Sequence, residues 1–255
     1  MMRALYTAAS GMMAQQTNID NISHNLSNVQ STAYKKSRTE FEDLLYASMD
    51  SPTLQADTGI QMGMGTRAVA NSRQFSGGSL KATGSNFDLA IQGNGFFAVK
   101  TPDGKTAYTR DGSFKMDDKG ALCTTSGASL GIKIPKDMMD IRIDPDGKIS
   151  GVPLTGSERQ NFAQIKLTRF LNPAGLKALG QNLYAWTPTA GDKVEGKPQG
   201  AGFGAVTQGF LEQSNVNIVE EMINILQAQR SFEINQKTVQ VADDMQKEAI
   251  QLKKA

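Results

Sequence analysis

The C-terminal residues 214–255 constrain the fold most, because they carry one uninterrupted helical pattern. Apolar residues recur there in steps of three, four and seven, which places them on one face of a helix. Ser214 or Asn215 can cap the start of the helix, and Glu220 and Glu221 lie in an early turn, where the helix dipole favours acidic side chains. No glycine or proline interrupts the run.

At about 1.5 Å per residue the helix is roughly 50 Å long or more. A face of that length needs a partner, and the obvious partner is the other end of the chain. The positions expected to pair are Ile218, Met222, Ile225, Phe232, Val239 and Met245.

Residues 2–29 carry a second helical pattern, with apolar residues seven apart and others at the alternate heptad positions. Only Arg3 and Asp20 are formally charged in this segment. An uncharged surface suits a helix enclosed by other helices, so the pattern favours coiled-coil packing; an ordinary helix of a globular core is the alternative. The pairing positions expected here are Leu5, Met12, Ile19, Ile22, Leu26 and Val29.

Composition excludes several classes of protein. The 255 residues suffice for one large or two modest domains, and the net charge of +2 comes from mixed acids and bases with no basic stripe. Nucleic acid is therefore a poor candidate partner. A single cysteine excludes an internal disulfide, and no run of about 18 apolar residues is present to cross a membrane. The N-terminus also lacks the apolar run of a cleavable secretory signal.

Between residues 87 and 186 the hydrophobic period becomes two, which predicts a compact all-β domain. The turn Gly93-Asn94-Gly95 between apolar runs predicts a hairpin of 87–92 with 96–100. Asp- or Pro-containing turns ending in glycine follow at 102–104, 110–112, 118–120 and 145–147, and another alternating strand is expected over 163–170. Residues 37–75 are expected to be an irregular connector with a short helical piece at 40–46. The predicted fold class is therefore α+β, with paired terminal helices and an inserted β domain.

No catalytic, cofactor or metal site is expected. His24 is the only histidine and has no His or Cys neighbours, so a hydrogen-bonded or interfacial role is favoured. Cys123 lies in a strand-like run, which favours a small buried residue over a reactive thiol. Residues 144–147 lack the remaining ligands of a calcium loop and are interpreted as a turn. A β-domain wall-glycan hydrolase or adhesin on a helical stalk is kept as an alternative, because carboxylate pairs can be remote in sequence.

Four motifs, in order along the chain, resemble those of bacterial flagellar rod and hook proteins. The first is an Asn-aliphatic-small-Asn core running into a Thr-x-aromatic-Lys ending, in which Ala33 occupies the position where the family usually has glycine. The second and third are residues 91–97 and 108–114, and the last lies in the C-terminal segment. The matching motif residues are Asn25, Asn28, Thr32, Tyr34, Lys35, Ser214, Asn215, Gln229, Arg230, Glu233 and Asn235.

Residues 41–46 followed by 60–65 are most similar to the distal-rod members of that family. The resemblance implies four segments: a polymerisation helix over 1–36, a connector over 37–75, a β-rich domain over 76–204 and a second polymerisation helix over 205–255. It implies a homopolymeric tube that transmits torque across the periplasm, and export through the flagellum's own channel without a cleaved signal peptide. It also implies partners: proximal rod proteins, the hook protein or its adaptor, the ring proteins that act as a bushing, and the export apparatus. A proximal rod or hook subunit is the alternative within the family. Membrane insertion is not expected.

Overall fold

The chain folds into two compact units that each combine segments distant in sequence. The computed structural model describes residues 2–48, 61–135, 138–154 and 159–254. The helical unit comprises residues 1–27, 37–73 and 217–255, and the β unit comprises residues 28–36 and 74–216. The α+β fold class is confirmed. The unit boundaries differ from the four expected segments, since 28–36 and 205–216 belong with the β strands. Within the described part of the chain, no helix has the length and apolarity needed to span a bilayer.

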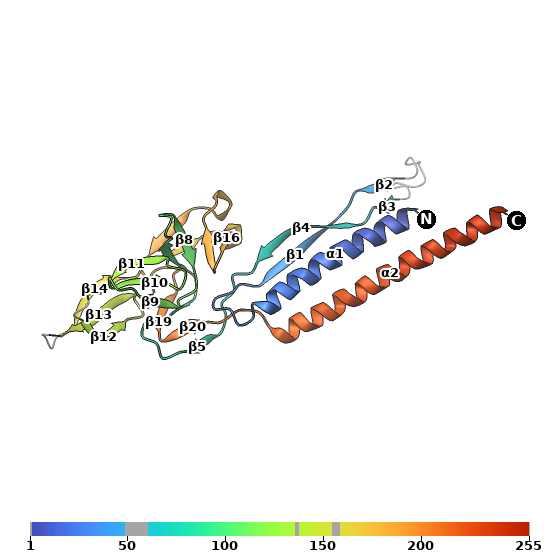
Figure 1. Cartoon of the computed structure of the whole chain (residues 1–255). Helices are drawn as coiled ribbons and strands as arrows, with labels where there is room; N and C mark the ends of the chain where they lie inside the picture. The colour runs from blue at the N-terminus through green and yellow to red at the C-terminus, as the bar shows by residue number, and fades with distance from the viewer. Residues whose placement is uncertain (1, 49–60, 136–137, 155–158, 255) are drawn as a thin grey trace. The chain divides into compact units, whose positions relative to one another are not determined.

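In the helical unit, the two terminal helices lie side by side. They are α1 (Met2–Ser27) and α2 (Ile218–Lys254). Figure 1 shows both chain ends at the same end of this pair, and a β ribbon running along α1. The strands of the ribbon are β1 (Ser37–Asp43) paired with β4 (Thr66–Arg73), and β2 (Tyr46–Ser48) paired with β3 (Gln61–Gly63), all antiparallel.

The expectation of an irregular connector with a helical piece at 40–46 is wrong for the described residues. Residues 37–43 form a strand, and the ribbon packs along α1. The Asn21 amide donates to the Thr39 hydroxyl at 3.0 Å, and the Thr66 N–H donates to the Ser10 hydroxyl at 3.4 Å. The ribbon thus supplies a cover for the uncharged surface of α1, and this tertiary contact outweighs the local preference of residues 40–46. Residues 49–60, including Ile60 of the distal-rod motif, lie outside the described residues.

The start of α2 also differs from the expectation. The helix begins at Ile218, and the Asn217 side chain accepts a hydrogen bond from the Val219 N–H at 3.1 Å. Asn217 is therefore the N-cap residue, in place of Ser214 or Asn215.

The β unit is built around a nine-stranded sheet. Its main path runs β16-β17-β8-β7-β11-β10-β9, with β15 pairing to both β7 and β18. These strands are β7 (Phe96–Lys100), β8 (Thr106–Thr109), β9 (Phe114–Met116), β10 (Ala121–Thr124), β11 (Ser129–Lys133), β15 (Leu167–Phe170), β16 (Lys177–Gly180), β17 (Leu183–Ala185) and β18 (Lys193–Gly196). Two short 3₁₀ helices, η1 (Pro173–Gly175) and η2 (Pro188–Ala190), lie between strands of this sheet.

Three smaller sheets complete the unit. The first is three-stranded, in the order β12-β13-β14, and the others are the pairs β19-β6 and β20-β5. Their strands are β5 (Leu80–Ala82), β6 (Leu89–Gln92), β12 (Met138–Ile143), β13 (Lys148–Pro153), β14 (Gln160–Gln164), β19 (Ala205–Gln208) and β20 (Phe210–Glu212).

Strand β7 separates two apolar clusters. Because side chains alternate across a strand, Phe96 and Phe97 point to opposite faces, yet both are buried. Phe97 joins the larger cluster with Leu89 and Phe114, while Phe96 joins an aromatic cluster with Tyr184. Both faces of the central sheet are therefore covered.

Two strand predictions are wrong. Residues 89–92 and 96–100 do not form a hairpin: β6 pairs with β19, and β7 pairs with β8, β11 and β15. Residues 163–170 are divided between β14 and β15, which belong to different sheets. In both places long-range pairing outweighs the local turn or alternation signal. The turns at 102–104, 118–120 and 145–147 do connect paired strands, as predicted.

Gly112→Ala should destabilise the β unit by about 2 kcal/mol or more, because a Cβ there would lie 1.6 Å from the Leu89 carbonyl oxygen. The matched control is Gly77→Ala, because a Cβ at residue 77 meets nothing within 4 Å. This variant should change the free energy of unfolding by less than about 1 kcal/mol. Urea unfolding followed by fluorescence of the single tryptophan, Trp186, measures both. Equal midpoints for the two variants would contradict the close approach.

Candidate functional site: the terminal motifs and their buried contacts

The face of α2 that packs on α1 has a strict heptad spacing. Its positions alternate in steps of four and three, and they are Glu221, Ile225, Ala228, Phe232, Asn235, Val239 and Ala242, all buried or half-buried. On α1, a Cβ at Gly11 would lie 2.9 Å from the Asn235 amide nitrogen. A glycine therefore lets the two helices approach closely at this point.

A second apolar stripe runs along the opposite face of α2 and is exposed. At about 100° per residue, Val219, Ile223 and Leu226 lie about 100–180° around the helix from Ile225 and Phe232. The large apolar residues exposed on α2 are Ile218, Val219, Met222, Ile223, Leu226, Ile234, Val241, Met245, Ile250 and Leu252. We call this set the outer stripe, although Ile250, Ile218 and Met222 lie off its line, closer to the α1 face.

The single stripe expected from the sequence is wrong in part, since Met245 lies on the exposed side of α2 and Ile218 and Met222 lie at the edge of the face that packs on α1. Ile225, Phe232 and Val239 are half-buried on the α1 side. Ile218, Met222 and Met245 are 45%, 53% and 49% exposed, so the described residues of the helical unit cover them only in part. On the N-terminal side, Ile22 is buried, and the remaining expected positions, Leu5, Met12, Ile19, Leu26 and Val29, are half-buried. Val29 lies beyond the end of α1, in the β unit.

Asn25 is the centre of a buried polar network in the helical unit. It is 1% exposed, and its amide nitrogen donates to the Ser37 carbonyl at 2.8 Å while its amide oxygen accepts from the Ser37 N–H at 3.0 Å. The amide nitrogen also lies 3.3 Å from a carboxylate oxygen of Glu221, which is fully buried. One side chain therefore joins the end of α1, the start of β1 and the first turn of α2.

Lys35 is the corresponding anchor in the β unit. Its side chain is fully buried, and its ammonium donates to the Glu212 carboxylate at 2.6 Å and to the Ser76 carbonyl at 2.7 Å. Glu212, 1% exposed, also accepts from the Gly78 N–H at 3.0 Å. The N-terminal motif is thus held to the segment that leads into α2 by a buried ion pair.

A second cation shares the same carboxylate. Arg110 is 4% exposed, and its Nε lies 3.5 Å from the other oxygen of Glu212 without making a hydrogen bond. Burial, and then the positive charge of Arg110, lowers the pKa of Lys35 below its ordinary value, while Glu212 opposes this shift. Burial also lowers the pKa of Arg110. One carboxylate therefore serves two buried cations, which leaves the cluster with a net charge of +1.

The remaining motif residues close to this cluster form hydrogen bonds with backbone groups. The Asn215 side chain accepts from the Lys36 N–H at 2.7 Å and donates to the Gln74 carbonyl at 2.9 Å. Ala33 has φ +56°, a left-handed conformation that explains the family's usual glycine there, and its N–H donates to the Glu212 carbonyl at 2.8 Å. Similar backbone contacts involve Thr32, Tyr34 and Ser214, and the Asn28 side-chain oxygen accepts from the Ser31 hydroxyl at 3.1 Å.

Three motif residues of α2 point outward. Gln229, Arg230 and Glu233 are exposed, in contrast to Asn235, which is half-buried against α1. The motif therefore divides into residues that fix the fold of one chain and residues available to other molecules.

Sequence reasoning missed Glu212, Arg110 and Glu221. Glu212 and Glu221 lie in or beside the matched C-terminal motif, and Arg110 lies in the matched run 108–114, but nothing local marks them as buried. The available signal was the positive charge of Lys35: a motif lysine that is buried needs a carboxylate, and the C-terminal segment supplies Glu212.

The described residues bring together no group of three or more His, Cys, Asp or Glu side chains that could hold a metal ion. His24 is exposed on α1, and Cys123 is half-buried in β10.

Asn25→Asp should destabilise the helical unit by about 3 kcal/mol, because it places a second carboxylate against buried Glu221 and removes the donor to Ser37. The control is Asn28→Asp, which keeps the oxygen that accepts from the Ser31 hydroxyl and should cost less than about 1 kcal/mol. Urea titration followed by far-UV circular dichroism checks both. A loss as small for Asn25→Asp as for the control would refute the buried network.

Glu212→Gln should destabilise the β unit by about 3–5 kcal/mol, since it leaves Lys35 and Arg110 buried without a counter-charge. In Glu195→Gln the lost partner, Lys193, is exposed and 3.8 Å away, so the cost should stay below about 1 kcal/mol. Trp186 fluorescence during urea unfolding reports both values. Similar midpoints for the two variants would show that the buried cluster is not the anchor.

Comparison with known proteins matches three segments of the chain, which contain all four motifs. Residues 5–35 match the flagella basal body rod protein family, residues 90–151 match the flagellar hook protein FlgE/F/G D1 domain, and residues 207–252 match the flagellar basal body rod FlgEFG protein C-terminal family. Flagellar basal-body rod protein FlgG of Borreliella burgdorferi is 44% identical over 96% of each chain. FlgG of Caulobacter vibrioides is 40% identical over 99% of this chain and 100% of its own, and FlgG of Bacillus subtilis is 36% identical over the full length of both. The chain therefore belongs to the FlgE/F/G family of flagellar basal-body rod and hook proteins.

Proposed function

We propose that this chain is a structural subunit of the distal flagellar rod, which polymerises into a helical tube and transmits torque to the hook. The observation that carries the proposal is the outer stripe of α2, which a single chain leaves exposed along most of a 37-residue helix. Similarity over nearly the whole length to relatives named as basal-body rod proteins supports the same role.

The outer stripe gives a driving force for association. Burying a large apolar side chain contributes about 1.5–3 kcal/mol, and the exposed fractions of Val219, Ile234 and Leu252 are 64%, 64% and 80%. In the proposed polymer, the stripe of one copy packs on a different surface of the next copy. A contact between unlike surfaces that does not close into a ring generates a helical polymer.

The buried contacts of the terminal motifs suit a load-bearing role. Removing either partner of a fully buried ion pair is costly, so the Lys35–Glu212 contact resists separation of the two terminal segments of the β unit. The Asn25–Ser37–Glu221 network does the same in the helical unit. The function proposed is mechanical, with no catalytic turnover and no cofactor.

The proposed partners follow from the rod assignment. They are further copies of this chain, proximal rod proteins, the hook protein or its adaptor, and the ring proteins that surround the rod. The proposed location is the part of the basal body that spans the periplasm, reached through the flagellar export apparatus without a cleaved signal peptide.

The double variant Leu226→Gln/Ile234→Gln should abolish polymerisation while the monomer keeps its helix content and unfolding midpoint, because both side chains are exposed in the single chain at 56% and 64%. Light scattering and electron microscopy measure assembly, and circular dichroism measures the monomer. Ile225→Asp and Leu26→Asp are the comparison, since both residues are half-buried in the helical unit or at its edge and should lose helix stability as well as assembly. Filaments of the double variant at the wild-type critical concentration would contradict the proposal.

A further inference from the structure

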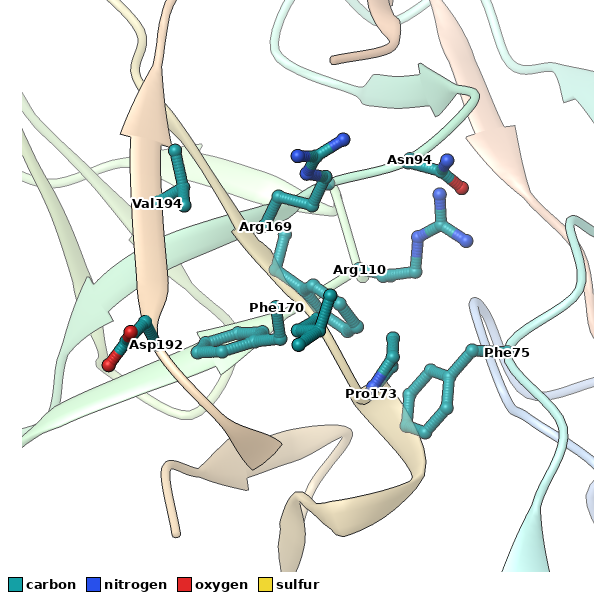
Figure 2. Close-up of a pocket in the computed structure, with 11 residues that line it drawn as sticks. Phe75, Asn94, Arg110, Arg169, Phe170, Pro173, Asp192 and Val194 are labelled. Carbon is teal, nitrogen blue, oxygen red and sulfur yellow. The ribbon is translucent and has the colours of Figure 1, made fainter. Parts of the chain in front are cut away.

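A pocket of about 510 Å³ opens on the β unit and is not used by the contacts described so far. Aromatic and aliphatic side chains form its walls and two arginines enter it. We call it the arginine pocket and define it by Phe75, Phe96, Arg110, Arg169, Phe170 and Leu171. Figure 2 shows the guanidinium of Arg110 beside the Asn94 amide, with the Phe75 ring close by.

Arg110 brings a positive charge to the wall of the pocket, and it shares the Glu212 carboxylate with Lys35. Its Nη2 donates to the Gly93 carbonyl, and its Cζ lies 5.7 Å from the centre of the Phe96 ring. Its Nε has no hydrogen-bond partner among the described residues, and the nearest carboxylate, Glu212, is already bonded to Lys35. Because two buried cations share one carboxylate, a further negative charge in the pocket would stabilise Arg110.

The other charges of the pocket do not supply that anion. The Arg169 Nη1 donates to the Gly202 carbonyl at 3.4 Å, and Arg169 adds a second cation. Asp192 is the only acidic lining residue described, and Figure 2 shows its carboxylate at the opposite end of the pocket from Arg110. The lining therefore carries an excess of one positive charge.

These features define the class of ligand. Two guanidiniums favour a carboxylate, which can accept paired N–H donors, and the phenylalanine rings favour apolar groups on either side of it. Leu171 at the rim is 89% exposed. An apolar group of the ligand can therefore also pack against Leu171, outside the cavity. The fitting ligand is an extended peptide with one acidic side chain between two apolar ones.

The chain itself exposes such a peptide. Phe41, Asp43 and Leu45 alternate along and just beyond β1, so they share one face of an extended segment. Phe41 is 43% exposed, Leu45 is 88% exposed, and Asp43 between them is exposed. The Asp43 carboxylate acts as a hydrogen-bond acceptor there and raises the pKa of the exposed Tyr46.

We propose that the arginine pocket receives residues 41–45 of a second copy of this chain, with Asp43 pairing to Arg169 and Arg110 and with Phe41 and Leu45 against the rings and Leu171. The proposal rests on the proposed function, because it names one contact by which copies are held in the polymer. It is chosen over other acidic partners because the charge and the apolar spacing of 41–45 match the pocket.

A charge exchange tests the pairing. Arg110 is unsuitable because it belongs to the buried cluster, so Arg169 is changed. Arg169→Glu alone and Asp43→Arg alone should each raise the critical concentration for polymerisation about tenfold. In the double variant, the critical concentration should return most of the way to the wild-type value. Asp118→Arg, which changes an exposed turn carboxylate of the β unit, should not rescue Arg169→Glu. Additive losses in the double variant would overturn the proposal.

Disulfide trapping tests whether residues 41–45 of a second copy occupy the arginine pocket. In a Cys123→Ser background, Leu45→Cys chains mixed with Leu171→Cys chains should form a crosslinked dimer only on polymerisation. Leu179→Cys, which is 55% exposed on β16 outside the lining, is the control in place of Leu171→Cys and should not crosslink.

The outcomes separate the two proposals. If the wild-type chain never polymerises, the proposed function and this contact both fail. If it polymerises without the crosslink and without charge rescue, only the pocket contact is overturned. A crosslink formed within one chain carrying both cysteines, at dilutions where no polymer exists, would also overturn it, because the occupant would then be the chain's own ribbon.

Discussion

The arrangement of apolar residues on α2 is the constraint on which the rest of the structure depends. One face of this helix has a regular heptad and packs on α1, where Gly11 permits close approach to Asn235. The opposite face carries the outer stripe, and the β1–β4 ribbon covers α1 rather than α2. A single chain can therefore satisfy one face of its longest helix and not the other. That imbalance is what makes a polymer, rather than the monomer, the state in which this apolar surface is removed from water.

Buried charges fix which segments meet. A Lys35–Glu212 ion pair with Arg110 beside it contributes little net stability compared with apolar packing, because all three groups lose their hydration. What such a cluster supplies is specificity, since any other register would leave a charge unpaired. The same reasoning applies to Asn25, whose three contacts permit one position of β1 and α2 relative to the end of α1. The motifs of the family thus coincide with the points where the two ends of the chain are held in place.

Much of this was accessible from the sequence, and the failures have physical causes. The two helices and the β domain follow from periodicity, and the motif residues follow from the resemblance to the rod and hook family. The stripe expected on α2 was wrong in part because each step of three residues turns about 60° around the helix, so the two steps from Val239 through Ala242 to Met245 leave the face that packs on α1. The hairpin at Asn94 was wrong because β6 pairs with β19, which lies more than a hundred residues away along the chain. Glu212 and Arg110 were missed because burial of a charge depends on partners that only the fold brings together.

Methionine oxidation in the unmodified protein tests the central claim most directly. Met222 and Met245 belong to the outer stripe and are about half exposed in the single chain. Met139 on the β unit is 61% exposed and serves as the comparison outside the outer stripe. Monomer and polymer are treated with dilute peroxide, and the sulfoxide at each position is measured by mass spectrometry. Burial of the outer stripe between copies predicts fast oxidation of Met222 and Met245 in the monomer and strong protection of both in the polymer. Unchanged oxidation rates of these two residues on polymerisation would contradict the account.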